Sequence, residues 1–256
     1  MSRVAATAAA GLPFTLAAAA LAAVLAAAPA PAAAAESCRP GFPDHLNFRF
    51  CADSGGWFAG FSDLPADQLG GDLFALSFRR ARVPHAPSAD RLLGLRVSGH
   101  NRSDDLFMYV KRQLTGLAPN AAYAIDLRFT LYTNAGRGCV GIGGAPGEAV
   151  YVKAGAVTFE PEAVEDEFGD LQLNLDKGNQ AQGGDDAAVL GDLAAAGANC
   201  AGTVYVPKRF AATGPDALVG ETDRDGNLWV LIGTDSGFEG LTTWYITHIR
   251  LAVRRL

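Results

Sequence analysis

Apolar and polar residues alternate with a period of two along most of the chain. In residues 123–131, large apolar residues occupy the odd positions, while Asp126, Arg128 and Thr130 occupy even ones. Similar runs occupy residues 46–50, 73–78, 92–97, 106–114, 149–159, 171–175, 204–210, 228–232 and 245–254. Successive side chains of a β-strand point to opposite faces, so this pattern predicts strands with one buried and one solvated face.

Turn-forming residues separate these runs and indicate short connections. Pro119 and Asn120 precede the run at 123–131, and the dipeptide Asp225-Gly226 is typical of a tight hairpin turn. The predicted fold class is all-β, an antiparallel β-sandwich of jelly-roll type with at most one short helix. Residues 186–196 are the segment in which a helix fits, although Gly191 disfavours it.

The first 35 residues have the composition of a secretory signal peptide. Arg3 is followed by an almost wholly apolar stretch over residues 4–29, and the small residues 33–35 form a cleavage site. We expect residues 1–35 to be removed and residues 36–256 to form a single β-sandwich domain, secreted or periplasmic. A retained membrane anchor is the alternative. After cleavage, no second apolar stretch approaches the length of a membrane span.

All four cysteines follow this signal, and an even number in an exported chain favours disulfide bonds. Three pairings can be drawn. We favour Cys38 with Cys51, which closes a short loop, and Cys139 with Cys200, which joins two distant loops. No Cys-x-x-Cys occurs and no histidine adjoins a cysteine, which argues against a zinc or redox site.

The charge of the chain limits its partners. The formal net charge is −6 at pH 7, and an acidic chain of this kind is a poor match for nucleic acid. We therefore expect no nucleic-acid partner.

Three motifs follow one another between residues 94 and 131. Residues 95–99 read Leu-Arg-Val-Ser-Gly, residues 116–120 read Gly-Leu-Ala-Pro-Asn, and Tyr123 opens a long apolar-polar run. This layout resembles part of a jelly-roll carbohydrate-binding module, including the galactose-binding-like domains. The resemblance implies a sandwich fold and a glycan as partner, but its motifs are structural. The whole chain also resembles exported bacterial β-sandwich proteins, and that resemblance implies no activity.

Two polar loops, at residues 176–186 and 233–240, and Trp244, which follows the second loop, carry the side chains that we expect to bind a ligand. Carboxylates and amides hydrogen-bond to hydroxyl groups, and an aromatic ring can stack against a sugar. The candidate ligand-binding residues are Asp176, Asn179, Gln180, Asp235, Glu239 and Trp244. A solvated loop is the alternative for the polar residues, and a position in the core is the alternative for the tryptophan.

These features favour an exported, non-catalytic module that binds a glycan or a cell-envelope component. A structural or protein-interaction role in the envelope is the first alternative. A hydrolase that uses carboxylates from Asp104, Asp105, Glu148 and Asp176 is the second. Neither Gly-x-Ser-x-Gly nor His-Glu-x-x-His occurs, so no catalytic residue is assigned. No cofactor is expected, although the acidic loops leave a structural calcium ion open.

Overall fold

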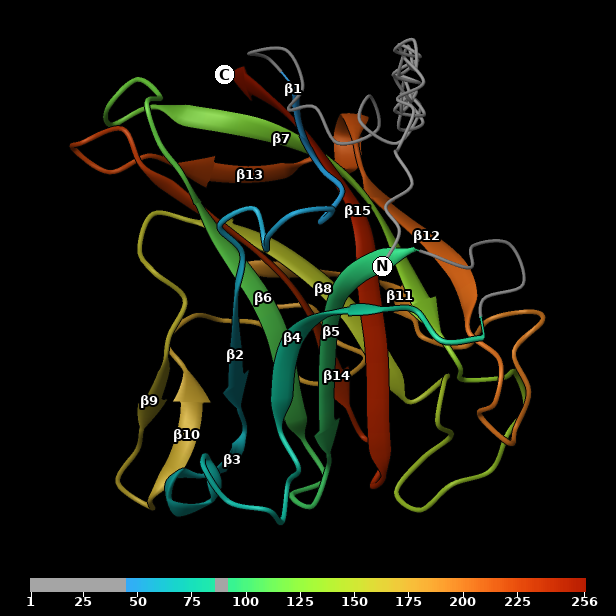
Figure 1. Cartoon of the computed structure of the whole chain (residues 1–256). Coiled ribbons are helices and arrows are strands. Elements are labelled where there is room, and N and C mark those ends of the chain that lie inside the picture. Colours follow the sequence, from blue (N-terminus) through green and yellow to red (C-terminus); the bar gives the residue numbers. More distant parts are fainter. Residues whose placement is uncertain (1–44, 86–91) are drawn as a thin grey trace, which may run out of the picture.

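The computed structural model describes residues 45–85 and 92–256, which form three antiparallel sheets (Figure 1). The two large sheets enclose one hydrophobic core, and the small third sheet lies beside β2. The predicted fold class, an all-β antiparallel sandwich of jelly-roll type, is confirmed. The helical elements of the described residues are two short 3₁₀ turns, η1 (Ala66–Gln68) and η2 (Gly214–Asp216). In these same ranges, no helix has the length and apolar character needed to cross a bilayer.

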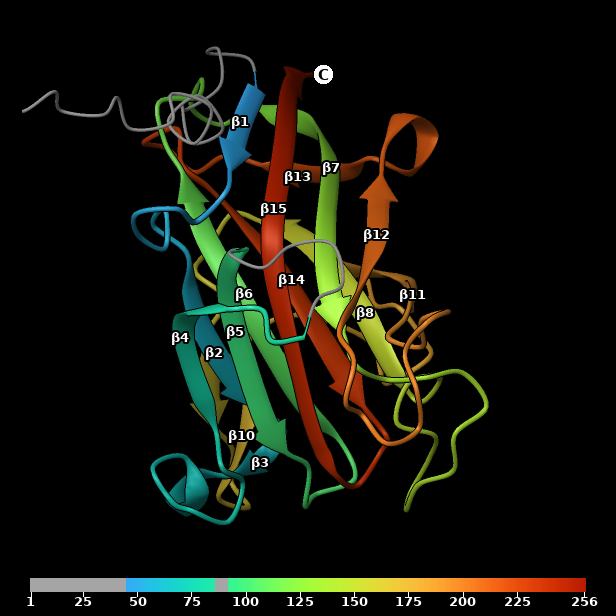
Figure 2. The same ribbon diagram turned by 45° about the vertical axis from the view of Figure 1, so that its right-hand side comes forward.

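The seven-stranded sheet has β15 at its centre, as Figure 2 shows. Its strand order is β12-β7-β15-β5-β4, with β1 paired to β15 and β13 paired to β7. The strands are β1 (His45–Phe48), β4 (Ser77–Arg82), β5 (Leu93–His100), β7 (Ala122–Thr133), β12 (Val206–Ala212), β13 (Leu218–Glu221) and β15 (Leu241–Arg255). A bulge between Ile246 and His248 shifts the alternation along β15, so its inward positions are even before the bulge and odd after it.

The five-stranded sheet has the order β11-β8-β14-β6-β2. Its strands are β2 (Phe58–Ser62), β6 (Leu106–Leu114), β8 (Val150–Val157), β11 (Ala187–Asp192) and β14 (Leu228–Ser236). The third sheet, of order β3-β10-β9, consists of β3 (Leu64–Pro65), β9 (Ala163–Glu165) and β10 (Asp170–Leu173).

The central strands of the five-stranded sheet are largely buried on both faces. Every residue of β14 is buried. On the face away from the main core, Phe107, Tyr109 and Trp229 form a second apolar cluster with Leu175. Leu175 belongs to residues 160–186, which include β9 and β10 and which we call the covering segment. This cover explains why residues 106–114 carry large apolar side chains at both odd and even positions.

Two local predictions were wrong. Residues 186–196 contain strand β11 rather than a helix, because this segment pairs with β8 from Ala187 onward, with a register shift before Gly191. A strand was predicted at residues 73–78, but β4 begins only at Ser77. The backbone turns there instead, and Ala75 has a positive φ of 47°.

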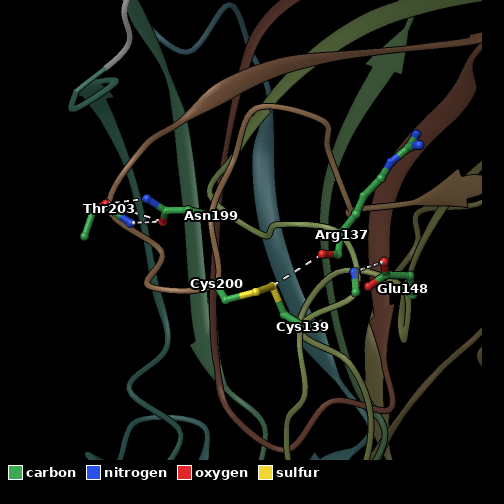
Figure 3. Close-up of a disulfide and its surroundings, with 7 residues drawn as sticks. Arg137, Cys139, Glu148, Asn199, Cys200 and Thr203 are labelled. Carbon is green, nitrogen blue, oxygen red and sulfur yellow. Dashed lines mark hydrogen bonds between the residues drawn. A yellow bond between two sulfur atoms is a disulfide. The ribbon is translucent and has the colours of Figure 1, made fainter.

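The predicted disulfide between Cys139 and Cys200 is present and joins the loop between β7 and β8 to the loop between β11 and β12 (Figure 3). Its cysteines are separated by 61 residues in sequence. The neighbouring loops are tied internally: the Gly138 N–H donates to Glu148, and the Asn199 side chain bonds to Thr203. The other predicted pair includes Cys38, which lies outside the described residues, and none of the described cysteines is free.

Removing the Cys139–Cys200 disulfide is expected to destabilise the fold strongly. Closing a loop of this length restricts the unfolded chain, and the chain-entropy relation gives a loss of about 4 kcal/mol for the Cys139→Ser/Cys200→Ser variant. Urea unfolding followed by circular dichroism measures the change. An unfolding free energy within about 1 kcal/mol of the wild-type value would contradict the prediction, because two ordinary surface substitutions together reach that size.

Candidate functional site

The loop at residues 176–186 uses its own carboxylates to hold its shape. Asp176 accepts hydrogen bonds from the Gly178 and Asp185 N–H groups, at 2.9 and 3.0 Å. Asp186 in turn accepts one from the Asp176 N–H at 2.8 Å. The two backbone N–H donors lower the pKa of Asp176. The carboxylate of Asp176 is thus already committed to the backbone of its own loop.

A ligand site formed by the loops at residues 176–186 and 233–240 would require the two loops to meet. They do meet, but their contact is a buried ion cluster. Asp235 is fully buried, and its Oδ2 lies 2.8 Å from Lys153 Nζ and 3.1 Å from Lys177 Nζ. The Gln180 N–H donates to the same oxygen at 3.0 Å. Lys153 also donates to the carbonyl oxygens of Lys177 and Gln182. Asp235 and Lys153 therefore fasten the covering segment to the five-stranded sheet.

Trp244 is a core residue, which corrects its assignment as a ligand-stacking ring. Its side chain is fully buried, and its indole N–H donates to Thr234 Oγ1 at 3.0 Å. The alternation of β15 points it between the two sheets. Of the other candidates, Asn179 and Glu239 are exposed and Gln180 is half-buried, with its side-chain amide donating to the Asp104 carbonyl oxygen. A ligand role for these residues stays a prediction.

Two further carboxyl groups complete the ion cluster. Asp63 Oδ2 lies 3.3 Å from Lys177 Nζ, and the Asp105 carboxyl interacts with that of Asp235. Asp105 Oδ1 and Asp235 Oδ1 are both buried, and neither oxygen has a hydrogen-bond donor among the described residues. Two carboxyl oxygens bond to each other only when one of them carries a proton. The cluster of three carboxyls and two ammonium groups is then neutral.

Burial and charge assign that proton to Asp105. Burial, followed by its contacts with Asp235, raises the pKa of Asp105 to about 8. The pKa of Asp235 is lowered, because Lys177 and the bonds from Asp105 and Lys153 together outweigh its burial. Burial also raises the pKa of Asp63 to about 6 against the opposing effect of Lys177. At neutral pH, Asp105 is therefore the neutral acid and Asp235 the buried anion.

The backbone is strained at Asp63 and at Asp104, the residue before Asp105. Asp63 and Asp104 have φ angles of 62° and 66°, in the left-handed region that non-glycine residues seldom adopt. The Asp63 N–H donates to the Leu171 carbonyl oxygen at 2.6 Å, and its own carbonyl accepts from Ser103 Oγ at 2.6 Å. These bonds join the loops before β3 and β6 to β10. Asp63 and Asp105 are thereby held together although 42 positions separate their numbers in the sequence.

A groove of 530 Å³ opens beside these two acids. Residues of η1, the loop before β6 and strand β10 line it. Figure 1 shows β3 and β10 of the small sheet at the same end of the molecule. Asp63 and Asp105 line the groove, and the remaining lining combines charged, amide and apolar side chains. Those that present functional groups or exposed apolar surface are Asp67, Gln68, Leu73, Arg102, Asp170 and Gln172. None of the six ligand residues predicted from the sequence lines this groove.

The sequence contained one weak signal for this site. Asp105 was among the acids proposed for a hydrolase. Asp63 and Asp170 were not recognised, because they reach the groove only through contacts between segments that are far apart in the sequence. The other acids of that proposal do not line the groove: Asp176 closes its own loop, and Glu148 accepts from Gly138 near the disulfide. Among the described residues, no three or more His, Cys, Asp or Glu side chains are grouped to hold a metal ion.

No protein-family model and no curated protein matches this sequence. Similar solved structures are mostly carbohydrate-binding modules with a β-sandwich fold, the group that residues 94–123 resemble. A module that recognises mannan is 13% identical, with a TM-score of 0.38, and the match covers 83% of this chain and 99% of the module. The family 11 carbohydrate-binding module of a Clostridium thermocellum cellulase is 10% identical, with a TM-score of 0.36, over 83% and 95% of the two chains.

The chain spans only part of some similar structures. It matches 19% of the enzymatically active domain of bacteriophage CBA120 tailspike protein 4, at 8% identity over 75% of this chain and a TM-score of 0.33. It matches 57% of another carbohydrate-binding β-sandwich at the same TM-score. With scores this low, none of these similarities carries an argument about ligand or activity.

The buried ion cluster predicts a large difference between two lysine substitutions. Lys153→Met leaves the buried Asp235 charge with one lysine fewer, and we expect it to cost about 3 kcal/mol or more of unfolding free energy. The matched control is Lys208→Met, which removes a part-exposed pair with Asp192 and should cost about 1 kcal/mol or less. Chemical unfolding of both variants measures the difference. Equal losses would contradict a special role for the buried cluster.

The raised pKa of Asp105 predicts that stability falls as pH rises. The folded chain keeps the Asp105 proton up to about pH 8, whereas an unfolded Asp releases it near pH 4, so this group costs stability between about pH 4 and pH 8. Asp105→Asn supplies a permanent donor to Asp235 and does not ionise. Melting temperatures from pH 5 to 8.5 should therefore decline less for this variant than for wild type. Parallel pH profiles would show that Asp105 is not the proton carrier.

Proposed function

We propose that this protein is an exported module that binds a glycan, or another hydroxyl-rich component of the cell envelope, in the groove between η1 and β10. The observation that carries the proposal is the convergence of carboxyl, amide and guanidinium groups on one concavity. Binding sites for small polar ligands have this character: a hollow with a few placed polar groups and some apolar wall.

The groove offers the hydrogen-bonding groups that sugar hydroxyls need. Gln68 and Gln172 each carry a donor and an acceptor, Asp67 and Asp170 accept, and Arg102 donates. Leu73, whose side chain is 53% exposed, adds apolar wall. A hydroxyl both donates and accepts, so such a mixed lining suits a neutral sugar better than it suits an apolar ligand.

Export is a further part of the proposal. The Cys139–Cys200 disulfide supports it, because such bonds persist in oxidising compartments and are rare in the cytoplasm. A secreted or periplasmic location would also bring the groove to polysaccharides of the cell envelope. A structural calcium ion, which the acidic loops left open, stays a prediction. An envelope protein with a purely structural role is still an alternative, but it would have no use for a polar groove.

A carboxylate-dependent hydrolase is the second candidate, and one observation favours it. Asp63 and Asp105 line the same groove and both have raised pKa values, of about 6 and about 8. Perturbed acids in a cleft are candidates for acid–base chemistry, although structural ion networks also perturb pKa values. Asp63 is only 7% exposed and bonded to Lys177, which favours the structural explanation.

Binding in the groove is tested by screening the protein against a glycan array and measuring the best ligand by calorimetry. The double variant Gln68→Ala/Gln172→Ala should weaken binding about tenfold or more, because a typical hydrogen bond contributes about 1 kcal/mol. The matched control, Gln182→Ala, removes an exposed amide outside the groove and should leave the affinity unchanged.

Failure to bind any glycan would refute the proposal, as would a ligand whose affinity is insensitive to the double variant. Release of reducing sugar from the bound ligand, abolished by Asp105→Asn, would favour the hydrolase over the binding module.

A further inference from the structure

The outer face of the seven-stranded sheet carries a set of arginines from five strands. Inward residues such as Val97, Leu127 and Ile249 fill the core, so the alternate positions of the same strands point outward. The outward arginines are Arg79 on β4, Arg96 on β5, Arg128 on β7, Arg209 on β12, and Arg250 and Arg254 on β15. Figure 2 shows β4, β5, β15, β7 and β12 side by side from left to right. We call these six residues the arginine face.

Two pairs within the arginine face lie directly opposite each other on neighbouring strands. Arg79 faces Arg96, and Arg128 faces Arg250. Like charges in directly opposed positions of a sheet destabilise it. Burial, and after it the charges of Arg49 and Arg250, lower the pKa of His248 on this face. The chain thus concentrates positive charge here although its overall charge is −6.

Neighbouring acids do not neutralise this charge. In residues 45–85 and 92–256, the ion pairs involve other residues, and none includes a member of the arginine face. All of its members are exposed except Arg96, which is half-buried and donates to Ser77. Asp126 is the acid among the outward positions of β7, and its Oδ1 accepts from the Gly214 N–H. Arg128 also donates to Thr213 Oγ1 at 3.5 Å, so the hydrogen-bond partners of these guanidinium groups among the described residues are hydroxyl groups and not acids. Their positive charge is available to an external anion.

We propose that the arginine face is a docking surface for a linear anionic polysaccharide, whose carboxylate or sulfate groups pair with the arginines. Arginine is suited to this role, because its planar guanidinium bonds two oxygens of such a group at once. Neighbouring strands lie about 4.8 Å apart, so the five strands present their arginines as an extended positive field. This surface is separate from the groove, and the inference stands independently of glycan binding there.

A polysaccharide fits this face better than single-stranded nucleic acid does. Proteins that bind single-stranded nucleic acid stack its bases on aromatic rings. Tyr132, Tyr205 and Tyr245 pack together on this face with Val83, and their exposed fractions are only 7%, 8% and 6%. Charge without stacking rings favours a polyanion that has no bases.

Binding to heparin and to polygalacturonate at low and high ionic strength tests the proposal with the full protein. Arg128→Gln/Arg250→Gln should weaken binding roughly tenfold and reduce its salt dependence, because both lost partners make charge-assisted bonds. The matched control, Arg137→Gln/Arg224→Gln, removes the same number of positive charges from exposed arginines outside this face. Its affinity should stay within about twofold of wild type, because salt screens the effect of distant charges on the arginine face. Dextran, which is neutral, should not bind to the arginine face.

The Arg128→Gln/Arg250→Gln variant also relieves a like-charge pair, so its melting temperature should equal or exceed that of wild type. That result would exclude misfolding as the cause of lost binding. Three outcomes would overturn the proposal: no binding of either polyanion at low salt, equal weakening by both double variants, or tighter binding of duplex DNA or anionic lipid vesicles with the same dependence on Arg128 and Arg250.

Discussion

The buried carboxylate of Asp235 is the constraint on which much of this structure depends. A charge removed from water is costly unless it is paired and hydrogen-bonded. Here Lys153, Lys177 and the Gln180 N–H all bond to one carboxylate oxygen. Two of these partners belong to the covering segment, so the pairing can form only when that segment lies against the five-stranded sheet. The ion cluster therefore fixes a place and a register that apolar contacts alone, being non-directional, would leave loose.

The groove is a consequence of this arrangement. Lys177 draws Asp63 into the cluster, and the Asp63 backbone bonds to β10 and to the loop before β6. The groove walls are therefore anchored to the same charges that hold the cover. The two faces of the sandwich differ accordingly. The five-stranded sheet has its outer face covered, and its buried charges Lys153 and Asp235 pair with each other. The seven-stranded sheet leaves six arginines facing outward, and none of them is in an ion pair among the described residues.

Alternation predicted the sandwich well because a period of two follows directly from strand geometry. Residues 106–114 match β6 residue for residue, and the run at 123–131 lies within β7. Prediction failed where contacts between distant segments decide the outcome. Residues 187–192 form a strand because β8 supplies an edge, and Trp244 is buried because β15 is central. The loops at residues 176–186 and 233–240 were correctly singled out as unusual, but their polar groups bond to each other. The groove acids Asp63 and Asp105 come together only in the folded chain.

Amide hydrogen exchange of wild type and Asp235→Asn tests the role of the buried charge most directly. If Asp235 fastens the cover, the variant should lose protection in residues 160–186 and at the Asp63 amide, while β7 and β15 keep theirs, since local opening need not involve the main core. Uniform loss of protection across both large sheets, or unchanged protection in the covering segment, would contradict this account.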